Sequence, residues 1–159
     1  MYKISNIGFT AILLSLVFIP VTKAIAQKKD FNSLHLALRL NQTTAKVIGS
    51  TGGGYSLASI VNQDRHGNHC MGYGDPEPDH TMILENDFSQ LKLQVNSGGK
   101  DTTLIVKRVD DRDIRCGFGK QHNRDAVIIG RNWQAGRYKI WVGSMQPGEN
   151  YNYSLSVEP

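Results

Sequence analysis

The chain has 159 residues, of which 40% are hydrophobic and 20% are charged, and this composition predicts one globular domain rather than a disordered chain. The formal net charge of +4 falls to +2 over 133 residues when the first 26 residues, which carry Lys3 and Lys23, are set aside. Such a small positive excess argues against a nucleic-acid binder and against a protein held on an anionic membrane.

The first 26 residues have the pattern of a cleaved signal peptide. Lys3 supplies the positive start, residues 7–19 form the apolar segment, Pro20 ends it, and Ala24-Ile25-Ala26 matches the small side chains required for cleavage. The alternative, an uncleaved anchor, needs about 20 apolar residues, and this run is shorter. We therefore predict cleavage after Ala26 and a secreted or periplasmic protein that is not held in the membrane.

Residues 27–54 predict an N-terminal strand or short helix followed by a linker. Leucines alternate with other residues over 31–40, which favours a strand, but the leucine and alanine content also fits a short helix, and both stay open. The glycines of 49–54 predict a flexible linker. A phosphate-binding loop is disfavoured because no Gly-Lys-Ser/Thr follows them.

Residues 55–159 read as short strands separated by turns, with a long polar loop at 62–80. The predicted strands cover residues 55–61, 81–85, 91–95, 103–109, 126–129, 137–142 and 151–157. This pattern predicts an all-β fold, an antiparallel β-sandwich of jelly-roll type. The expected core faces are Leu91, Leu93 and Val95; Tyr138, Ile140 and Val142; and Tyr153, Leu155 and Val157.

The two cysteines, Cys70 and Cys116, both lie in the part expected to be exported. An even number of cysteines in an oxidising compartment favours a disulfide, and no C-x-x-C pair suggests a zinc site. We predict a Cys70–Cys116 bridge that joins the long polar loop to the turn after the 103–109 strand.

Four stretches in the C-terminal half occur in a recognisable order. They are residues 91–95, 101–106, 133–143 and 151–157. This order resembles the bacterial pre-peptidase C-terminal domain, and more closely the small stand-alone secreted proteins of cyanobacterial type built on it, over about residues 80–159. The resemblance implies a β-sandwich without catalytic residues that often binds calcium or a partner domain. Family members often carry paired aspartates after the second cysteine, whereas this chain has Gly-Phe-Gly-Lys at 117–120.

Acidic loop residues are the candidate metal ligands. Asp75 and Asp79 lie in the long loop and Asp110 and Asp111 in the turn after 103–109, and calcium prefers such oxygen ligands on loops. We therefore expect calcium as an optional stabiliser through these four aspartates. Solvated turn carboxylates are the commoner situation, and the histidines of the loop are interpreted in the same way, as surface residues.

Trp141 and Tyr73 are the candidate ligand contacts. If Tyr138, Ile140 and Val142 face the core, the alternation turns Trp141 outward, where it either contacts a ligand or lies under a second layer, for instance residues 31–40. No Gly-x-Ser-x-Gly, Ser-x-x-Lys or His-Glu-x-x-His motif is present. The sequence thus favours a monomeric, non-catalytic module that binds a protein or a glycan. The alternative is a small secreted hydrolase that uses carboxylates or histidines of 62–80.

Overall fold

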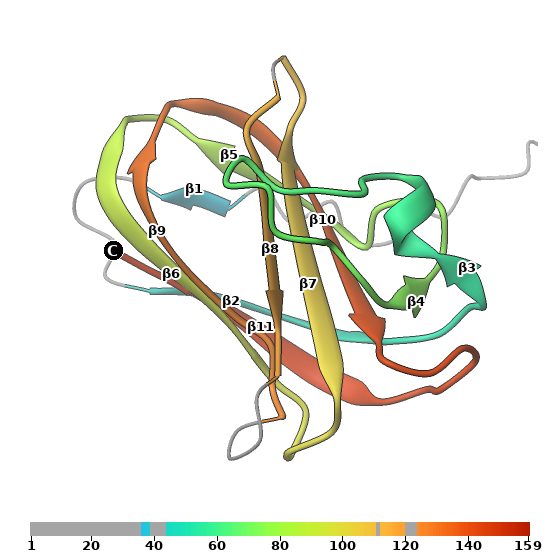
Figure 1. Cartoon of the computed structure of the whole chain (residues 1–159). Coiled ribbons are helices and arrows are strands. Elements are labelled where there is room, and N and C mark those ends of the chain that lie inside the picture. Colours follow the sequence, from blue (N-terminus) through green and yellow to red (C-terminus); the bar gives the residue numbers. More distant parts are fainter. Residues whose placement is uncertain (1–35, 39–43, 111, 120–123) are drawn as a thin grey trace, which may run out of the picture.

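The computed structural model describes residues 36–38, 44–110, 112–119 and 124–159. The predicted signal peptide lies outside these residues. Within the described part, none of the helices has the length and apolar character that a membrane crossing requires. The fold is all-β, as predicted: two sheets pack face to face, and a single 3₁₀ turn, η1 (Leu57–Ser59), is the one helical element described (Figure 1).

The larger sheet, called sheet A here, has seven strands. They are β1 (Leu36–Leu38), β3 (Tyr55–Ser56), β4 (Tyr73–Gly74), β5 (His80–Leu84), β7 (Thr102–Arg108), β8 (Ile114–Phe118) and β10 (Gly136–Ser144). β10 is central, because it pairs with β7 on one side and with β5 and β4 on the other. β8 pairs with β7 alone and forms an edge of the sheet.

The smaller sheet, sheet B, has the order β2-β11-β6-β9. Its strands are β2 (Ala45–Ser50), β6 (Phe88–Asn96), β9 (Val127–Trp133) and β11 (Asn152–Glu158). All pairings in sheet B are antiparallel, and the one parallel pairing in the described structure joins β1 to β5 in sheet A. Both β2 and β9 are edge strands.

The core between the sheets is built from the alternating residues that the sequence pattern singled out. All nine predicted core residues are buried, with exposed fractions from 0 to 4%. Trp133 joins this core, and its ring meets that of Tyr138 edge-on at 5.5 Å between centroids. Period-two alternation in β6, β10 and β11 therefore correctly assigned the inner faces.

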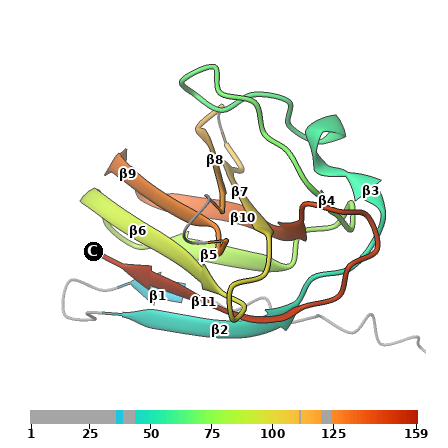
Figure 2. The ribbon, with the colours of Figure 1, turned by 60° about the horizontal axis from the view of Figure 1, so that its bottom comes forward.

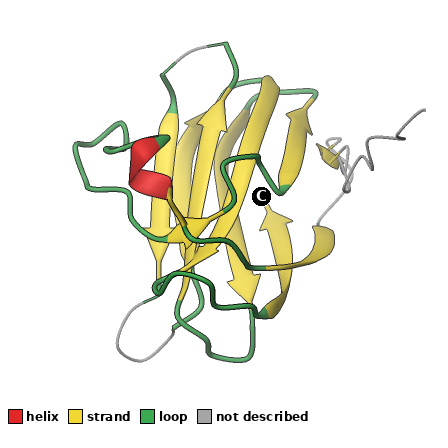
Figure 3. Cartoon of the chain, turned by 90° about the vertical axis from the view of Figure 1, so that its right-hand side faces the viewer, coloured by secondary structure: helices red, strands yellow, loops and turns green. Residues whose placement is uncertain are grey.

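A second apolar cluster covers the outer face of sheet A. Leu57, Val61 and Cys70 from the 57–70 segment pack against Ile105 of β7 and Trp141 of β10. Figure 3 shows the helical turn and its neighbouring loop on the outside of the strands, and Figure 2 shows the loop beyond β8, on the side away from β2. This 57–70 segment is called the covering segment below.

Several local predictions were wrong. Residues 55–61 form two strand residues and the 3₁₀ turn rather than one strand, because Leu57 turns inward onto Trp141. The sandwich also begins before residue 55: Ala45–Ser50, which runs into the glycine linker predicted at 49–54, pairs with β11 along its whole length. β8 was read as a turn. Of the 31–40 region, the described residues Leu36–Leu38 form a strand.

β2 escaped prediction because its own sequence carries little signal. Only Val47 is buried in it, and the strand is held by six paired positions with β11. Gly49 lies directly against the ring of Tyr153, where a Cβ would come within 2.6 Å of Cζ. The glycine that suggested a linker is therefore required by close packing against β11.

Candidate functional site

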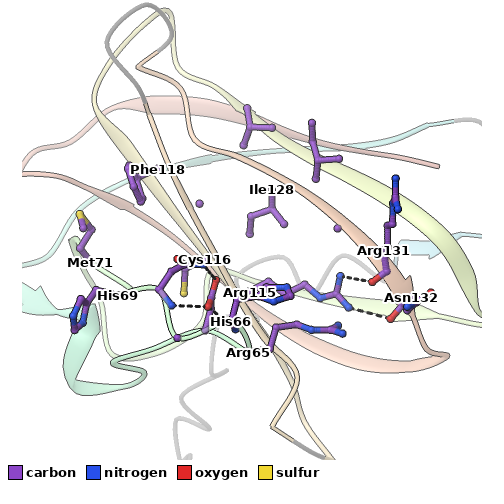
Figure 4. Close-up of a pocket in the computed structure, with 17 residues that line it drawn as sticks. Arg65, His66, His69, Met71, Arg115, Cys116, Phe118, Ile128, Arg131 and Asn132 are labelled. Carbon is purple, nitrogen blue, oxygen red and sulfur yellow. Dashed lines mark hydrogen bonds between the residues drawn. The ribbon is translucent and has the colours of Figure 1, made fainter.

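A cleft of about 960 Å³ lies beside the disulfide, between the edges of the two sheets. One wall is formed by residues 64–69 of the covering segment and by Met71, which follows it, and the rest by residues 115–118 of β8 and 127–132 of β9. It is called the disulfide cleft below (Figure 4). Since β8 and β9 are each paired on one side only, the cleft lies where the sandwich is open.

The wall formed by the loop is fixed from both ends. Cys70 is bonded to Cys116 with 5.5 Å between their Cα atoms, as the sequence predicted. The Arg65 N–H donates to the carbonyl of Ile114 at 2.9 Å, which attaches the loop to the free edge of β8. These two attachments to β8 hold the polar loop in place next to the cleft.

Asp64 organises the turn in this loop. Its Oδ1 accepts the backbone N–H groups of His66 and Asn68 at 2.8 and 2.9 Å, and its Oδ2 accepts the Asn68 amide at 3.0 Å. Burial alone would raise the pKa of Asp64, but these hydrogen bonds and the charge of His66 lower the pKa below the ordinary value. Both oxygens are engaged within the loop, so this carboxylate has a structural role in shaping the wall.

Arg115 crosses from β8 to β9 and closes one end of the cleft. Its Nη1 and Nη2 donate to the carbonyls of Arg131 and Asn132, both at 3.1 Å, and Nη2 contacts Asp113 at 2.8 Å. The guanidinium is 3.7 Å from the centroid of the Trp133 ring. A buried cation with carboxylate, carbonyl and aromatic partners is a rigid bridge between the two sheet edges.

Two glycines make this closure possible. At Gly130 a Cβ would come within 2.3 Å of Nη1 of Arg115, so a side chain there would displace the bridge. At Gly117 a Cβ would come within 2.3 Å of the carbonyl oxygen of Val127, so the absence of a side chain lets β8 approach β9. The cleft is therefore confined between a close strand contact at one end and the arginine bridge at the other.

The surface of the cleft combines apolar and cationic groups. Phe118 is 38% exposed and Ile129 is 66% exposed, and Met71 also lines the cleft. Three guanidinium groups, those of Arg65, Arg115 and Arg131, line the cleft, against the single lining carboxylate of Asp64. Figure 4 shows Arg115 pointing along the cleft to the Arg131 and Asn132 carbonyls, with His69, Met71 and Phe118 at the opposite end.

A second cleft of about 930 Å³ lies on the other side of the molecule, beside the segment that leads into β5. Its carboxylates are Asp75, Glu77 and Asp79, and its floor includes His80 and Tyr153, whose Nε2 and hydroxyl are 2.8 Å apart. Both rings are buried, and burial together with the charge of Asp79 raises the pKa of the Tyr153 phenol.

Asp79 fills a gap in the hydrogen bonding of sheet A. Along one edge of β10, pairing with β5 ends at Ile140 and pairing with β4 begins at Ser144. Between them the Val142 N–H donates to Asp79 Oδ2 at 2.7 Å. Burial raises the pKa of Asp79 to about 6, with a smaller contribution from the charge of Asp75, while the Val142 hydrogen bond opposes the shift. The carboxylate thus replaces a missing strand partner.

The predicted calcium ligands that the structure describes are not brought together. Asp75 and Asp79 line the second cleft, whereas Asp110 follows β7 near Arg137, and Asp111 lies outside the described residues. Arg137 and Val142 are about 17 Å apart along β10 at the usual rise per strand residue. The expectation of a shared site fails because the disulfide draws residues 64–70 toward β8, not residues 75–79. No group of three or more histidine, cysteine, aspartate or glutamate side chains suited to a metal occurs among the described residues.

The two predicted aromatic contacts also lie elsewhere than expected. Trp141 does lie opposite the inner core face, but it is only 4% exposed, and its Nε1 donates to the carbonyl of Pro76 at 3.2 Å. Among the described residues, the layer that covers it is the covering segment. Tyr73 is half-buried in β4. Neither residue lines either cleft, so an exposed Trp141 contact is ruled out by packing.

Of the residues that line the disulfide cleft, the sequence singled out only Cys116 and, for the hydrolase alternative, the 62–80 loop, and it missed the others of β8 and those of β9. Arg115 and Phe118 belong to β8, which was read as a turn, and Arg131 follows a strand predicted to end at residue 129. The available signal was the disulfide, which placed the polar loop beside residue 116.

Comparisons with known proteins add similarity at the level of the fold. No protein-family model and no curated protein matches the sequence. Among solved structures, the chain is similar to the pre-peptidase C-terminal domain of a collagenase from Bacillus anthracis, at 16% identity and a TM-score of 0.46, over 73% of this chain and 90% of that one. It is also similar to Aeromonas hydrophila PliG, a periplasmic inhibitor of g-type lysozyme, at 16% identity and a TM-score of 0.46, over 77% of this chain and 91% of that one.

Proposed function

We propose that this chain is an exported, non-catalytic binding module whose recognition site is the disulfide cleft and whose ligand is a protein. The observation that carries the proposal is the construction of this cleft. A disulfide, a loop-to-strand hydrogen bond and a buried arginine bridge hold its walls, while Phe118 and Ile129 stay exposed within it. Rigid walls with exposed apolar groups suit binding, because little conformational freedom is lost when a ligand is held.

The chemistry of the described residues supports a non-catalytic role. His66 and His69 of the loop are exposed, and both oxygens of Asp64 are engaged in the turn. In the second cleft, the carboxylate of Asp79 bonds to a backbone N–H of β10. Hydrogen bonds within the fold thus account for the carboxylates of Asp64 and Asp79. Export is proposed from the signal-peptide pattern of residues 1–26.

The test is a binding screen with two matched variants. The disulfide-bonded protein is immobilised and presented with a panel of extracellular proteins and glycans that includes a g-type lysozyme. Phe118→Ser changes the cleft, and Ile48→Ser changes an exposed isoleucine of β2 outside it. We expect a protein of the panel to bind the wild type and Ile48→Ser but not Phe118→Ser, with both variants unfolding as the wild type does.

Two results would overturn the proposal. Binding that survives Phe118→Ser would place recognition elsewhere, and binding confined to glycans would exclude a protein ligand. Turnover of a hydrolase substrate that disappears in Asp79→Asn or His69→Ala, with folding intact, would establish the enzymatic alternative instead.

Calcium is a separate proposal, limited to Asp75 and Asp79 of the second cleft. Thermal melts with calcium and with a chelator test it, since a ligand that binds only the folded state raises its stability by about 2.7 kcal/mol at a hundredfold excess over Kd. Equal melting temperatures in the two conditions would exclude it.

A further inference from the structure

The disulfide cleft exposes part of the backbone of β9. The Val95 N–H donates to the Ala126 carbonyl at 2.9 Å, and the register continues with Leu93 opposite Ile128. In an antiparallel pair the hydrogen-bonded positions alternate, so the N–H and C=O groups of Ile129 point away from β6 and toward the open edge. Among the described residues, no hydrogen bond to the backbone of Ile129 from the other side is formed.

The neighbouring positions of this edge are already used. On one side, Val127 lies against Gly117 of β8. On the other, the carbonyls of Arg131 and Asn132 accept hydrogen bonds from Arg115. The open stretch is therefore short and centred on Ile129, between the strand contact and the arginine bridge.

The charges around this stretch are unbalanced. Asp113 is shared by two guanidinium groups, with Arg65 at 3.2 Å and Arg115 at 2.8 Å. Arg131 is exposed and adds a third guanidinium group, with which no carboxylate of the described residues forms an ion pair. The three guanidinium groups of Arg65, Arg115 and Arg131 outnumber the two carboxylates of Asp64 and Asp113, so the cleft presents net positive charge to a ligand.

We infer, on the basis of the proposed function, that the disulfide cleft binds an extended acidic segment of a protein partner along β9. The backbone of the segment bonds to the N–H and C=O groups of Ile129, its carboxylates meet Arg131 and Arg65, and its alternate apolar side chains contact Phe118 and Met71. In a segment that alternates acidic and apolar residues, the backbone, the carboxylates and the apolar side chains can contact the Ile129 backbone, the guanidinium groups and the apolar wall at the same time. A sulfated glycan or a nucleic acid would form ion pairs with the guanidinium groups but would not use the Ile129 backbone or the apolar residues.

The experiment measures the affinity of two synthetic peptides for the purified, disulfide-bonded protein. They are an acetylated, amidated octapeptide of alternating valine and glutamate, and its valine–lysine counterpart. We expect the glutamate peptide to bind, more weakly as salt is raised because exposed charges are screened. Arg131→Glu should weaken it by about tenfold or more, since an attraction becomes a repulsion and 1.4 kcal/mol is tenfold in Kd. The same variant should gain affinity for the lysine peptide.

Two further variants test charge position and main-chain recognition. Arg137→Glu, at an exposed arginine of β10 outside the cleft, is the control and should bind as the wild type does. Ile129→Pro removes the N–H that faces the cleft and spares the ladder with β6, so it should lose peptide binding, while Ile129→Thr keeps the N–H and should retain it. If Ile129→Pro does not fold, the exchange of peptide preference in Arg131→Glu still decides the question.

The inference is overturned if the lysine peptide binds the wild type equally well, or if Arg131→Glu leaves the affinity for the glutamate peptide unchanged. It is also overturned if heparin or a single-stranded oligonucleotide binds as tightly and with the same Arg131 dependence, because charge alone would then explain recognition. Failure of the glutamate peptide, combined with a panel protein that requires Phe118, rejects the acidic strand and leaves the proposed function standing. If neither the glutamate peptide nor any panel protein binds, the acidic-segment inference and the proposed function are both rejected.

Discussion

The two sheets of the sandwich treat their outer faces differently. Sheet A is covered: Ile105 and Trp141 on its outer side are 1% and 4% exposed, beneath Leu57 and Val61 of the covering segment. Sheet B is open, and Ile48 and Ile129 on its outer side are 71% and 66% exposed. The disulfide cleft lies where these two arrangements meet, at the edges β8 and β9.

This difference bears on the stability of the fold and on the proposed recognition site. Every residue from Thr102 to Val106 in β7 is buried, because both faces of that strand are covered. In β11 the buried residues alternate with half-buried ones, because only one face is covered. The covered sheet offers its edge and its covering loop for contact with a partner, whereas the open sheet offers a face of mainly polar side chains with two separate isoleucines.

The largest effect should come from Trp141, the centre of the covered face. Trp141→Ala should lower the free energy of unfolding by about 3–5 kcal/mol, the usual cost of removing a buried aromatic side chain. Ile48→Ala on the open face should change it by no more than about 0.5 kcal/mol. Urea denaturation of both variants measures the contrast, and similar losses would show that sheet B also has a covered outer face.

Loss of the disulfide should come next. The bridge closes a loop of 46 residues, and the chain-entropy estimate gives about 4 kcal/mol for a loop of that length. A Cys70→Ser/Cys116→Ser double variant should therefore melt at a lower temperature, and hydrogen exchange should rise first in residues 57–70. Uniform exchange across both sheets would show that the covering segment and the sandwich unfold as one unit.

The smallest of these effects concerns pH and the gap that Asp79 fills at the edge of β10. Because folding raises its pKa from 3.8 to about 6, the folded state binds the proton more tightly, and stability falls as the pH rises from about 4 to about 6. Asp79→Asn keeps an oxygen for the Val142 N–H without the charge. The free energy of unfolding of Asp79→Asn should equal that of the wild type near pH 3.5. At pH 7 it should be larger by about 1–3 kcal/mol, since one pKa unit corresponds to 1.36 kcal/mol.

The control for this prediction is Glu77→Gln, an exposed carboxylate of the same cleft. Its pH profile of stability should follow that of the wild type. If Asp79→Asn is less stable than the wild type at pH 7, the charged hydrogen bond to Val142 outweighs the cost of burial, and the sign of the pKa shift is wrong.

Sequence reasoning succeeded where the pattern is local and repeated. Alternation assigned the inner faces of β6, β10 and β11, and the even cysteine count in a chain predicted to be exported indicated the bridge between Cys70 and Cys116. It failed for β8 and β2. β8 contains Arg115 and Gly117, which are residue types typical of a turn. Both are buried, because Arg115 bridges β8 to β9 and Gly117 lets these two strands approach each other.

The candidate site was beyond the sequence for a similar reason. Period-two alternation does say that Trp141 lies opposite Ile140, but it cannot say whether a distant segment covers that face, and here residues 57–70 do. The distance between the two acidic loops along β10 is set by strand register, which the loop sequences do not encode. Sequence reasoning therefore grouped them into one metal site.

By itself the sequence therefore determined the fold class, the inner faces of the sandwich and the disulfide, since each depends on side-chain period or residue type. The tertiary structure alone decided which outer face is covered, where the clefts lie and which charges meet in them. These depend on contacts between segments far apart in the chain, such as Arg65 with Asp113 or Asp79 with Val142. The physical reason is that hydrophobic burial is non-directional, so a residue pattern can specify burial without specifying the partner that provides it.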